Sequence, residues 1–530
     1  EDANNANTAI GHQALKTLNA GATGYNTAVG FTAGLSLQTG VQNTLIGAVA
    51  GDALDVGVEN VALGYASLTT DTKGNYSTAI GTFALAAQNF TSATSAFNTG
   101  VGYGAGSSLQ TGIQNTFLGG LAGDGTDDGN YNTGVGYGAL TENCGPNNTA
   151  VGYFAGKSIT GSFNTTLGQM AGQDLTSGTY NTYVGSEAGK GTGTTSGSSN
   201  VGVGYASLYS NSTGGSNTAV GLWSLFTNNT GGTNTAVGSY SMRYNTSGTA
   251  GTAVGYEALR DNQTASSNTA AGYQALLTNT TGANNTALGY QAGKGNSPSG
   301  SNNVYVGMRA GNGAVNAASS TFVGTNAGYS TSNGTLNTFL GADSGYYIST
   351  GGKNTILGRF NGNQDSLDIR TASNKVITSD GDGTITTYHD SEKLWVAGPV
   401  GAGVDNGAAL SAKAWTGHAR FNTSAGATQT FEFDANTGSS YVLEITISAY
   451  ASAGAGSFIR SIVDGGHPGG AAFHHVVTVA DSSSGYTLGT VTETAGGFTF
   501  TVASPGQSGA IYVLYRYSDT NNNLPILTFS

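Results

Sequence analysis

Asn217-Thr218-Ala219-Val220-Gly221 is the stretch that decides the fold, because near-copies of it begin at Asn7 and recur until Asn354. The copies number 21, and the commonest distance between their closing glycines is 17 residues. A fixed period of this length is typical of a solenoid, in which each repeat is one coil stacked on the next. The sequence therefore predicts an all-β, elongated parallel β-solenoid over residues 1–362.

The β-branched and aliphatic positions of the repeat indicate which side of the strand is buried. The residue three before the closing Gly is always Thr or Val, and the residue just before it is aliphatic in every copy. Two positions that lie two residues apart share one face of a strand. We therefore expect Thr218 and Val220 to face the core, and each coil to consist of two short strands and two turns.

An asparagine stands four residues before the Gly in 18 of the 21 copies. An amide at the same place in each coil can give and accept one hydrogen bond along the solenoid axis. The sequence therefore predicts a structural asparagine ladder that caps the turn entering each strand. The expected members are Asn26, Asn43, Asn60, Asn98, Asn115, Asn132, Asn148, Asn164, Asn181, Asn217, Asn234, Asn268, Asn285, Asn337 and Asn354.

Two positions after the Gly are also restricted. Three residues on, as at Ser224, the side chain is Ala or Ser in every copy but one, where it is Asn361, and four residues on it is either Gly or Leu/Met. A small residue at a fixed site indicates a close approach of backbones. Longer spacings, as between Gly81 and Gly102, predict insertions that bulge from a turn.

Composition and charge exclude several classes of function. Among 530 residues, 17 Lys and Arg face 29 Asp and Glu, which disfavours a nucleic-acid partner. No run of about 18 apolar residues occurs, so membrane insertion is not expected. Cys144 is the single cysteine, and stability must therefore come from hydrogen bonds and packing.

The period ends after the last repeat, and two further regions follow. Residues 363–404 alternate around Asp380-Gly381-Asp382-Gly383 and predict a connector of β-hairpins that closes the last open coil. Residues 405–530 contain short β-rich runs separated by Gly and Ser turns, which predict an antiparallel β-sandwich or jelly roll.

The repeat, in the form Asn285-Thr286-Ala287-Leu288-Gly289-Tyr290-Gln291-Ala292-Gly293, resembles the repeats of bacteriophage tail fibres. More distantly it is similar to the head repeats of trimeric autotransporter adhesins, and together the resemblances cover residues 7–386. They imply a homotrimeric fibre whose C-terminal tip meets a cell surface. The chain ends without a recognisable heptad stalk or anchor barrel, which disfavours the autotransporter.

Several residues that could carry chemistry also have simpler interpretations. Aromatics one residue after the Gly could form a sugar-stacking stripe, but packing at a corner is favoured. The Thr row could match an ice lattice, but its expected place on the core side disfavours this function. Asp124–Gly129 and Asp380–Gly383 are better explained as turns than as calcium loops, and the scattered carboxylates form no evident glycosidase pair.

The sequence therefore favours a non-enzymatic fibre protein of a phage tail, located in the virion, with no cofactor and no metal. Its expected partners are two further copies of itself, other tail or filament components, and a glycan or protein on the host surface. The alternatives are a bacterial extracellular filament or cell-surface adhesin and a polysaccharide depolymerase. The candidate receptor-binding residues lie in the tip and are Trp415, His467, His474 and Tyr486.

Overall fold

The computed structural model describes residues 6–19, 24–295, 299–365 and 367–389 with their side chains, and from residue 390 onward only the backbone of the strands. The chain divides into two units, residues 1–299 and 300–530. All regular elements in the described residues are β-strands, and the repeat region is a parallel β-solenoid, as the sequence predicted.

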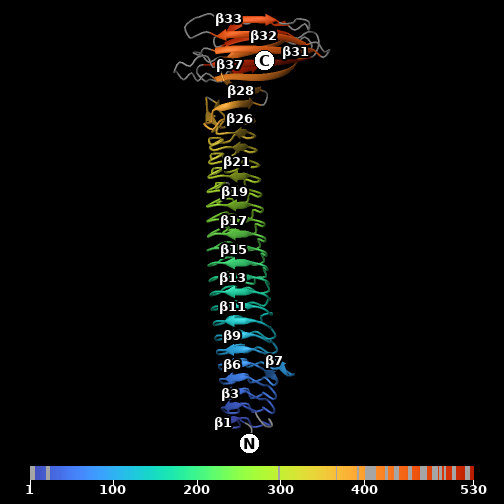
Figure 1. Cartoon of the computed structure of the whole chain (residues 1–530), viewed down its shortest axis with the longest axis vertical. Coiled ribbons are helices and arrows are strands. Elements are labelled where there is room, and N and C mark those ends of the chain that lie inside the picture. Colours follow the sequence, from blue (N-terminus) through green and yellow to red (C-terminus); the bar gives the residue numbers. More distant parts are fainter. Residues whose placement is uncertain are drawn as a thin grey trace. The chain divides into compact units, whose positions relative to one another are not determined.

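In the first unit, each coil contributes one three-residue strand, and the strands stack into a parallel column (Figure 1). Neighbouring strands pair in register, so that Thr218 lies opposite Thr235 and Val220 opposite Val237. The strands of the column are β1 (Thr8–Ile10), β2 (Thr27–Val29), β3 (Thr44–Ile46), β4 (Val61–Leu63), β6 (Thr78–Ile80), β8 (Thr99–Val101), β9 (Thr116–Leu118), β10 (Thr133–Val135), β11 (Thr149–Val151), β12 (Thr165–Leu167), β13 (Thr182–Val184), β14 (Val201–Val203), β15 (Thr218–Val220), β16 (Thr235–Val237), β17 (Thr252–Val254), β18 (Thr269–Ala271) and β19 (Thr286–Leu288).

The expectation of two strands per coil is wrong. The rest of each coil is a series of turns, in which the residues two and four after the Gly adopt left-handed backbone conformations, as at Trp223 and Leu225. The insertion between Gly81 and Gly102 adds β7 (Thr94–Ser95), which pairs in parallel with β5 (Gly74–Asn75) of the preceding coil at the side of the stack.

The predicted orientation of the strand is also wrong. Ala219, in the middle of the strand, is fully buried, whereas Thr218 and Val220 are only partly buried and lie on the outer face. The coil is so narrow that each three-residue strand directs one side chain inward. The β-branched residues at its ends fit the pleated strand itself, a preference that does not depend on which face is buried.

The closing glycine is required by the stacking of the coils. Gly221 has a φ of 132°, and a Cβ atom there would lie 2.6 Å from the carbonyl carbon of Gly238 in the next coil. The small residue at Ser224 is buried, and its hydroxyl donates a hydrogen bond to the Gly221 carbonyl at 3.1 Å. A close approach of backbones thus explains the closing glycine, and burial inside the coil explains the small residue at Ser224.

The second unit continues with coils of the same kind. Its parallel strands are β20 (Val304–Val306), β21 (Thr321–Val323), β22 (Thr338–Leu340), β23 (Thr355–Leu357) and β26 (Lys375–Ser379). Between the last two, β24 (Asn363–Gln364) and β25 (Leu367–Asp368) form a short antiparallel pair. The predicted Asp-Gly hairpin is present between β26 and β27 (Ile385–Asp390), where the Asp380 carboxylate accepts hydrogen bonds from the N–H groups of Asp382 and Thr384.

Beyond the hairpin the described strand backbones pair antiparallel. β28 (Lys393–Pro399) joins β27 to β29 (Lys413–Thr423), which is followed across the sheet by β37 (Gly509–Asp519), β31 (Tyr441–Ala451), β32 (Gly456–Gly465) and β33 (His474–Val479). A second sheet contains β30 (Thr428–Asp434), β34 (Thr487–Leu488), β35 (Thr492–Thr494), β36 (Gly497–Ala503) and β38 (Ile526–Phe529).

Candidate functional sites

The asparagines of the repeat form a hydrogen-bonded ladder inside the solenoid. The Asn217 backbone N–H donates to Asn200 Oδ1 at 3.0 Å, and Asn217 Nδ2 donates to the same oxygen at 3.1 Å and to the Gly231 carbonyl at 2.9 Å. Asn217 Oδ1 in turn accepts from the backbone N–H of Asn234 at 3.0 Å. The amides of Asn200 and Asn217 are buried and hydrogen-bonded, so they stabilise the coil and offer nothing to a ligand.

A second ladder was missed in the sequence. Buried asparagines seven residues after the closing Gly donate from Nδ2 to the Oδ1 of the preceding coil, at 2.7 Å for both Asn228 to Asn211 and Asn245 to Asn228. The series continues through Asn262 and Asn279. The sequence contains the signal for this ladder, because Asn recurs seven residues after the closing Gly in successive coils. It was not recognised because these asparagines lie in a turn.

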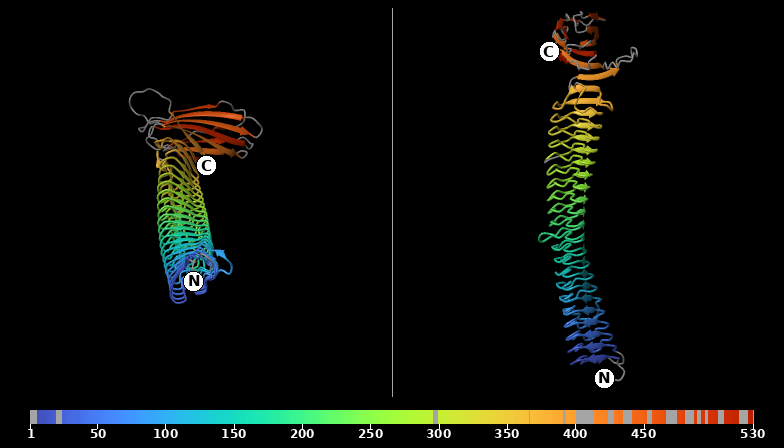
Figure 2. Two further views of the ribbon diagram at one scale, coloured as in Figure 1. Left: turned by 60° about the horizontal axis from the view of Figure 1, so that its bottom comes forward. Right: turned by 90° about the vertical axis from the view of Figure 1, so that its left-hand side faces the viewer.

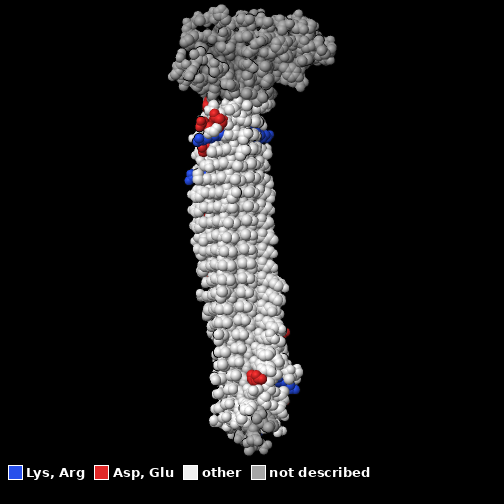
Figure 3. Space-filling view, in the orientation of Figure 1, with Lys and Arg blue, Asp and Glu red and all other residues white. Residues whose placement is uncertain are grey.

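The outer face of the strand column in the first unit is almost without charge (Figure 3). Partly exposed threonines form one row, and beside it runs a row of aliphatic residues. Seven large members of that second row are 36 to 60% exposed: Ile10, Leu63, Leu118, Leu167, Val237, Val254 and Leu288. Figure 2 shows the strands stacked along one side of this unit. A contiguous apolar surface of this kind is typical of a protein interface.

The sequence-based argument against ice binding is therefore wrong, since the threonines lie outside the core. The neighbouring row nevertheless mixes Val, Ile and Leu side chains of unequal reach. These give the face a relief that varies from coil to coil. Such relief is better suited to interdigitation with other side chains than to the uniform spacing of an ice surface.

The aromatic row after the Gly is exposed, but its rings mostly cover one another. Tyr256 and Tyr273 stack at 5.4 Å between ring centroids, and Tyr273 and Tyr290 at 5.3 Å, with interplanar angles of 12° and 8°. Rings stacked in this way leave mainly their edges to solvent, whereas a sugar would need a free face. The geometry supports the packing interpretation, and each pair adds about 0.5 to 1.5 kcal/mol to the corner.

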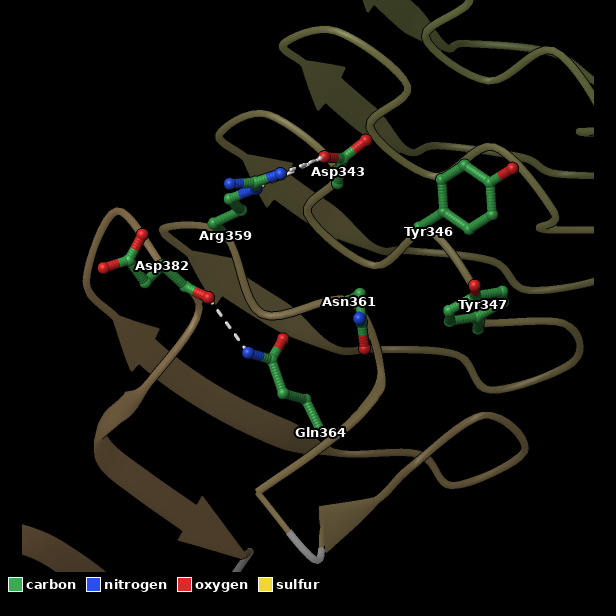
Figure 4. Close-up of a pocket in the computed structure, with 7 residues that line it drawn as sticks. All are labelled: Asp343, Tyr346, Tyr347, Arg359, Asn361, Gln364 and Asp382. Atoms are coloured by element: carbon green, nitrogen blue, oxygen red, sulfur yellow. Dashed lines mark hydrogen bonds and ion pairs between the residues drawn. The ribbon is translucent and has the colours of Figure 1, made fainter. Parts of the chain in front are cut away.

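A pocket of about 430 Å³ lies in the second unit, where the last coils meet the hairpin (Figure 4). Its lining combines two tyrosines, an ion pair, two amides and a further carboxylate: Asp343, Tyr346, Tyr347, Arg359, Asn361, Gln364 and Asp382. The Arg359 guanidinium lies 3.2 Å from the Asp343 carboxylate, which also accepts a hydrogen bond from Asn326 Nδ2 at 3.0 Å.

The tyrosines of this pocket differ in exposure. Tyr346 stacks on Tyr329 at 4.9 Å and meets Tyr347 edge to face at 4.8 Å, and Tyr347 is 49% exposed. Partial burial, with Tyr329, Tyr347 and Asp343 nearby, raises the pKa of Tyr346, so its hydroxyl stays protonated at neutral pH. Gln364 Nε2 donates to the Asp382 carbonyl at 2.9 Å and thereby ties the hairpin turn to the pocket.

The predicted tip residues are only partly placed. Trp415 belongs to β29 and His474 begins β33, while His467 and Tyr486 lie outside the described residues. Sequence reasoning missed the pocket, because its residues are separated along the chain and fall outside the repeat positions that show a pattern. Within the described ranges, no helix has the length and apolar character needed to cross a bilayer.

No protein-family model, curated protein or solved structure gives a significant match to this chain.

Proposed function

We propose that this chain is a structural, non-catalytic fibre protein of a phage tail, in which three copies associate along the outer faces of their strand columns. The observation that carries the proposal is the outer face itself, whose rows of Thr and aliphatic residues are partly or fully exposed in every described coil of the first unit. Burial of apolar surface is the main favourable contribution to protein association.

A second copy is the partner that this face fits best. The face repeats once per coil, and an identical face has the same rise from coil to coil, so the rows of two copies stay in step along the contact. A partner chosen by charge would find almost nothing to bind, because the residues of the two rows are uncharged. The number of three copies is taken from the resemblance to tail fibres.

The experiment is a native mass measurement on the intact chain and on a variant carrying Val237→Lys and Val254→Lys. These side chains are 36% and 43% exposed, so the coils should fold, whereas lysines on a buried trimer face should leave unpaired charges. We expect a trimeric mass for the wild type and a monomeric mass for the variant. A matched control, Thr230→Lys with Thr213→Lys, places the same charges in the turns and should remain trimeric.

A monomeric wild type would overturn the proposed assembly, as would a variant that stays trimeric. If the monomeric wild type also inhibited the growth of ice crystals, the face would instead be assigned to ice. Electron micrographs then distinguish the two fibre hypotheses, since rods that end on virions support the phage tail and continuous polymers support the bacterial filament or adhesin.

Receptor binding is proposed for residues 405–530, which contain Trp415, His467, His474 and Tyr486. The test is binding of the fluorescently labelled full chain to host cells, with each of the four residues replaced by Ala in turn. We expect at least one replacement to weaken binding while the trimeric mass is retained. Undiminished binding by all four variants would remove these residues from the receptor site.

A further inference from the structure

We propose that the pocket formed by Asp343, Tyr346, Tyr347, Arg359, Asn361, Gln364 and Asp382 binds a neutral saccharide unit. The residues of this site lie at the end of the coils, and none of them belongs to the proposed tip, residues 405–530. The inference does not depend on the number of copies in the assembly. It follows from three properties of the pocket, which are its size, its mixture of groups and its charge.

The size suits a small polar ligand. A volume of about 430 Å³ falls within the range of about 300 to 1,000 Å³ that is typical of small-molecule sites. The walls come from three separate segments, namely the turn at residues 343–347, the coil end at residues 359–364 and the hairpin at Asp382. The Gln364 to Asp382 hydrogen bond holds the last two together.

The lining supplies the groups that a sugar ring needs. Tyr347 offers a half-exposed aromatic side chain against which the C–H groups of a pyranose can pack. Around it, the described residues leave the Tyr346 hydroxyl, Asn361 Nδ2 and the Asp382 carboxylate without a hydrogen-bond partner. Both donors and acceptors are thus available, which matches vicinal hydroxyls, since each hydroxyl gives one hydrogen bond and accepts others.

The charge of the pocket disfavours the other ligand classes. The single cation, Arg359, is already neutralised by Asp343, and Asp382 leaves the lining with an excess negative charge, which opposes phosphate, sulfate and carboxylated sugars. No group of three His, Cys, Asp or Glu side chains that could hold a metal ion is found among the described residues. An apolar ligand would leave the polar lining groups without partners.

The test uses the full chain on an array of defined neutral and acidic oligosaccharides, followed by calorimetric titration of the best neutral ligand. Two variants probe the pocket. Tyr347→Ala removes the exposed ring, and Asp382→Asn keeps the shape of the side chain while removing its charge. The matched control is Tyr131→Ala, because Tyr131 is 50% exposed, much like Tyr347, but lies in the first unit.

We expect a neutral ligand whose affinity falls about tenfold in Tyr347→Ala, several-fold in Asp382→Asn and not at all in Tyr131→Ala. The native mass should be unchanged in all three variants, which separates this result from a failure of the fibre proposal. An array without neutral ligands would overturn the inference, as would binding that survives both pocket substitutions and therefore belongs elsewhere. If mass spectra showed shortened oligosaccharides, the pocket would be assigned to hydrolysis and not to binding alone.

Discussion

Gly345 lies against the ring of Phe339 inside the same coil, so close that a Cβ atom on Gly345 would be 2.6 Å from Cδ2 of the ring. The relationship holds throughout the solenoid. Wherever the middle strand residue is large, as at Phe322 or Ile356, the residue four after the closing Gly is glycine, and wherever that residue is Leu or Met the middle strand residue is Ala or Gly. The middle strand residue and the residue four after the Gly therefore share one volume, which holds a single large side chain supplied from either position.

This alternation predicts that the two positions can be exchanged. Phe339→Ala should lower the free energy of unfolding by about 3 to 5 kcal/mol, because it leaves a cavity in the core. Adding Gly345→Leu should recover a substantial part of this loss, since it recreates the Ala–Leu combination of Ala219 and Leu225. Leucine is compatible with the backbone there, because Leu225 has a φ of 49° and Gly345 a φ of 63°.

Urea denaturation of the single and double variants measures the exchange, with hydrogen exchange to locate the effect. The control is Gly345→Leu alone, which forces a second large side chain against the Phe339 ring and should be the least stable of the three. If the double variant were less stable than Phe339→Ala, the two positions would not share one volume.

The asparagine ladder makes a second prediction. Replacing Asn217 by Ala removes the acceptor of the buried Asn234 N–H. The Gly231 carbonyl keeps the hydrogen bond from Asn228 Nδ2, so one group is orphaned and the cost should be about 1 to 3 kcal/mol. Hydrogen exchange should show lost protection first at the coils on either side of Asn217. The exposed Asn147, next to ladder residue Asn148, is the control, and Asn147→Ala should cost less.

These relationships show how far the sequence predicts this molecule. The amide of Asn217 and the φ of Gly221 follow from the residue types, because few other side chains fit those positions. The faces of Thr218 and Val220 could not be predicted in the same way. Alternation identifies the core only when the opposite face is polar, and here Ala219 on the inside and Val220 on the outside are both apolar. The pocket brings Tyr347 and Asp382 to one site from separate segments, and the repeat period gives no sign of this.

Cys144 provides a probe of local opening. The thiol is buried, and burial raises its pKa to about 11. It lies 3.1 Å from the Thr126 hydroxyl of the preceding coil. The reactive thiolate is therefore scarce at pH 7.5, and we expect iodoacetamide to label the native chain far more slowly than the urea-unfolded chain. As Cys144 is the single cysteine, mass spectrometry gives the rate directly. Equal rates in the two states would show that this coil is open.

Where Ser77 replaces the ladder asparagine, a buried network takes over. Gln88 Nε2 donates to Ser77 Oγ at 2.9 Å and to Asp71 Oδ2 at 2.6 Å, and Gln88 Oε1 accepts from Asn98 Nδ2 at 2.9 Å. Asp71 is fully buried, and this burial raises the pKa of its carboxyl, against the opposing effect of hydrogen bonds from Gln88 and from the N–H groups of Gly74, Phe90 and Lys73.

The raised pKa fixes the direction of a pH effect. Because the folded state holds the Asp71 proton more tightly than the unfolded state, the stability from this proton is fully present below the unfolded pKa of 3.8 and is lost as pH rises through the folded pKa. Asp71→Asn removes the titration. The difference in unfolding free energy, wild type minus variant, should therefore be largest in acid and fall to a plateau above the folded pKa.

Urea denaturation of both proteins from pH 3.5 to pH 8 measures this difference, with the buffer ionic strength held constant. Gln88→Met sharpens the test, since it removes a hydrogen bond that favours the charged carboxylate. In that background the fall should move to higher pH. A difference that stayed constant with pH, or that grew as pH rose, would mean that Asp71 is ionised as easily in the folded chain as in the unfolded one.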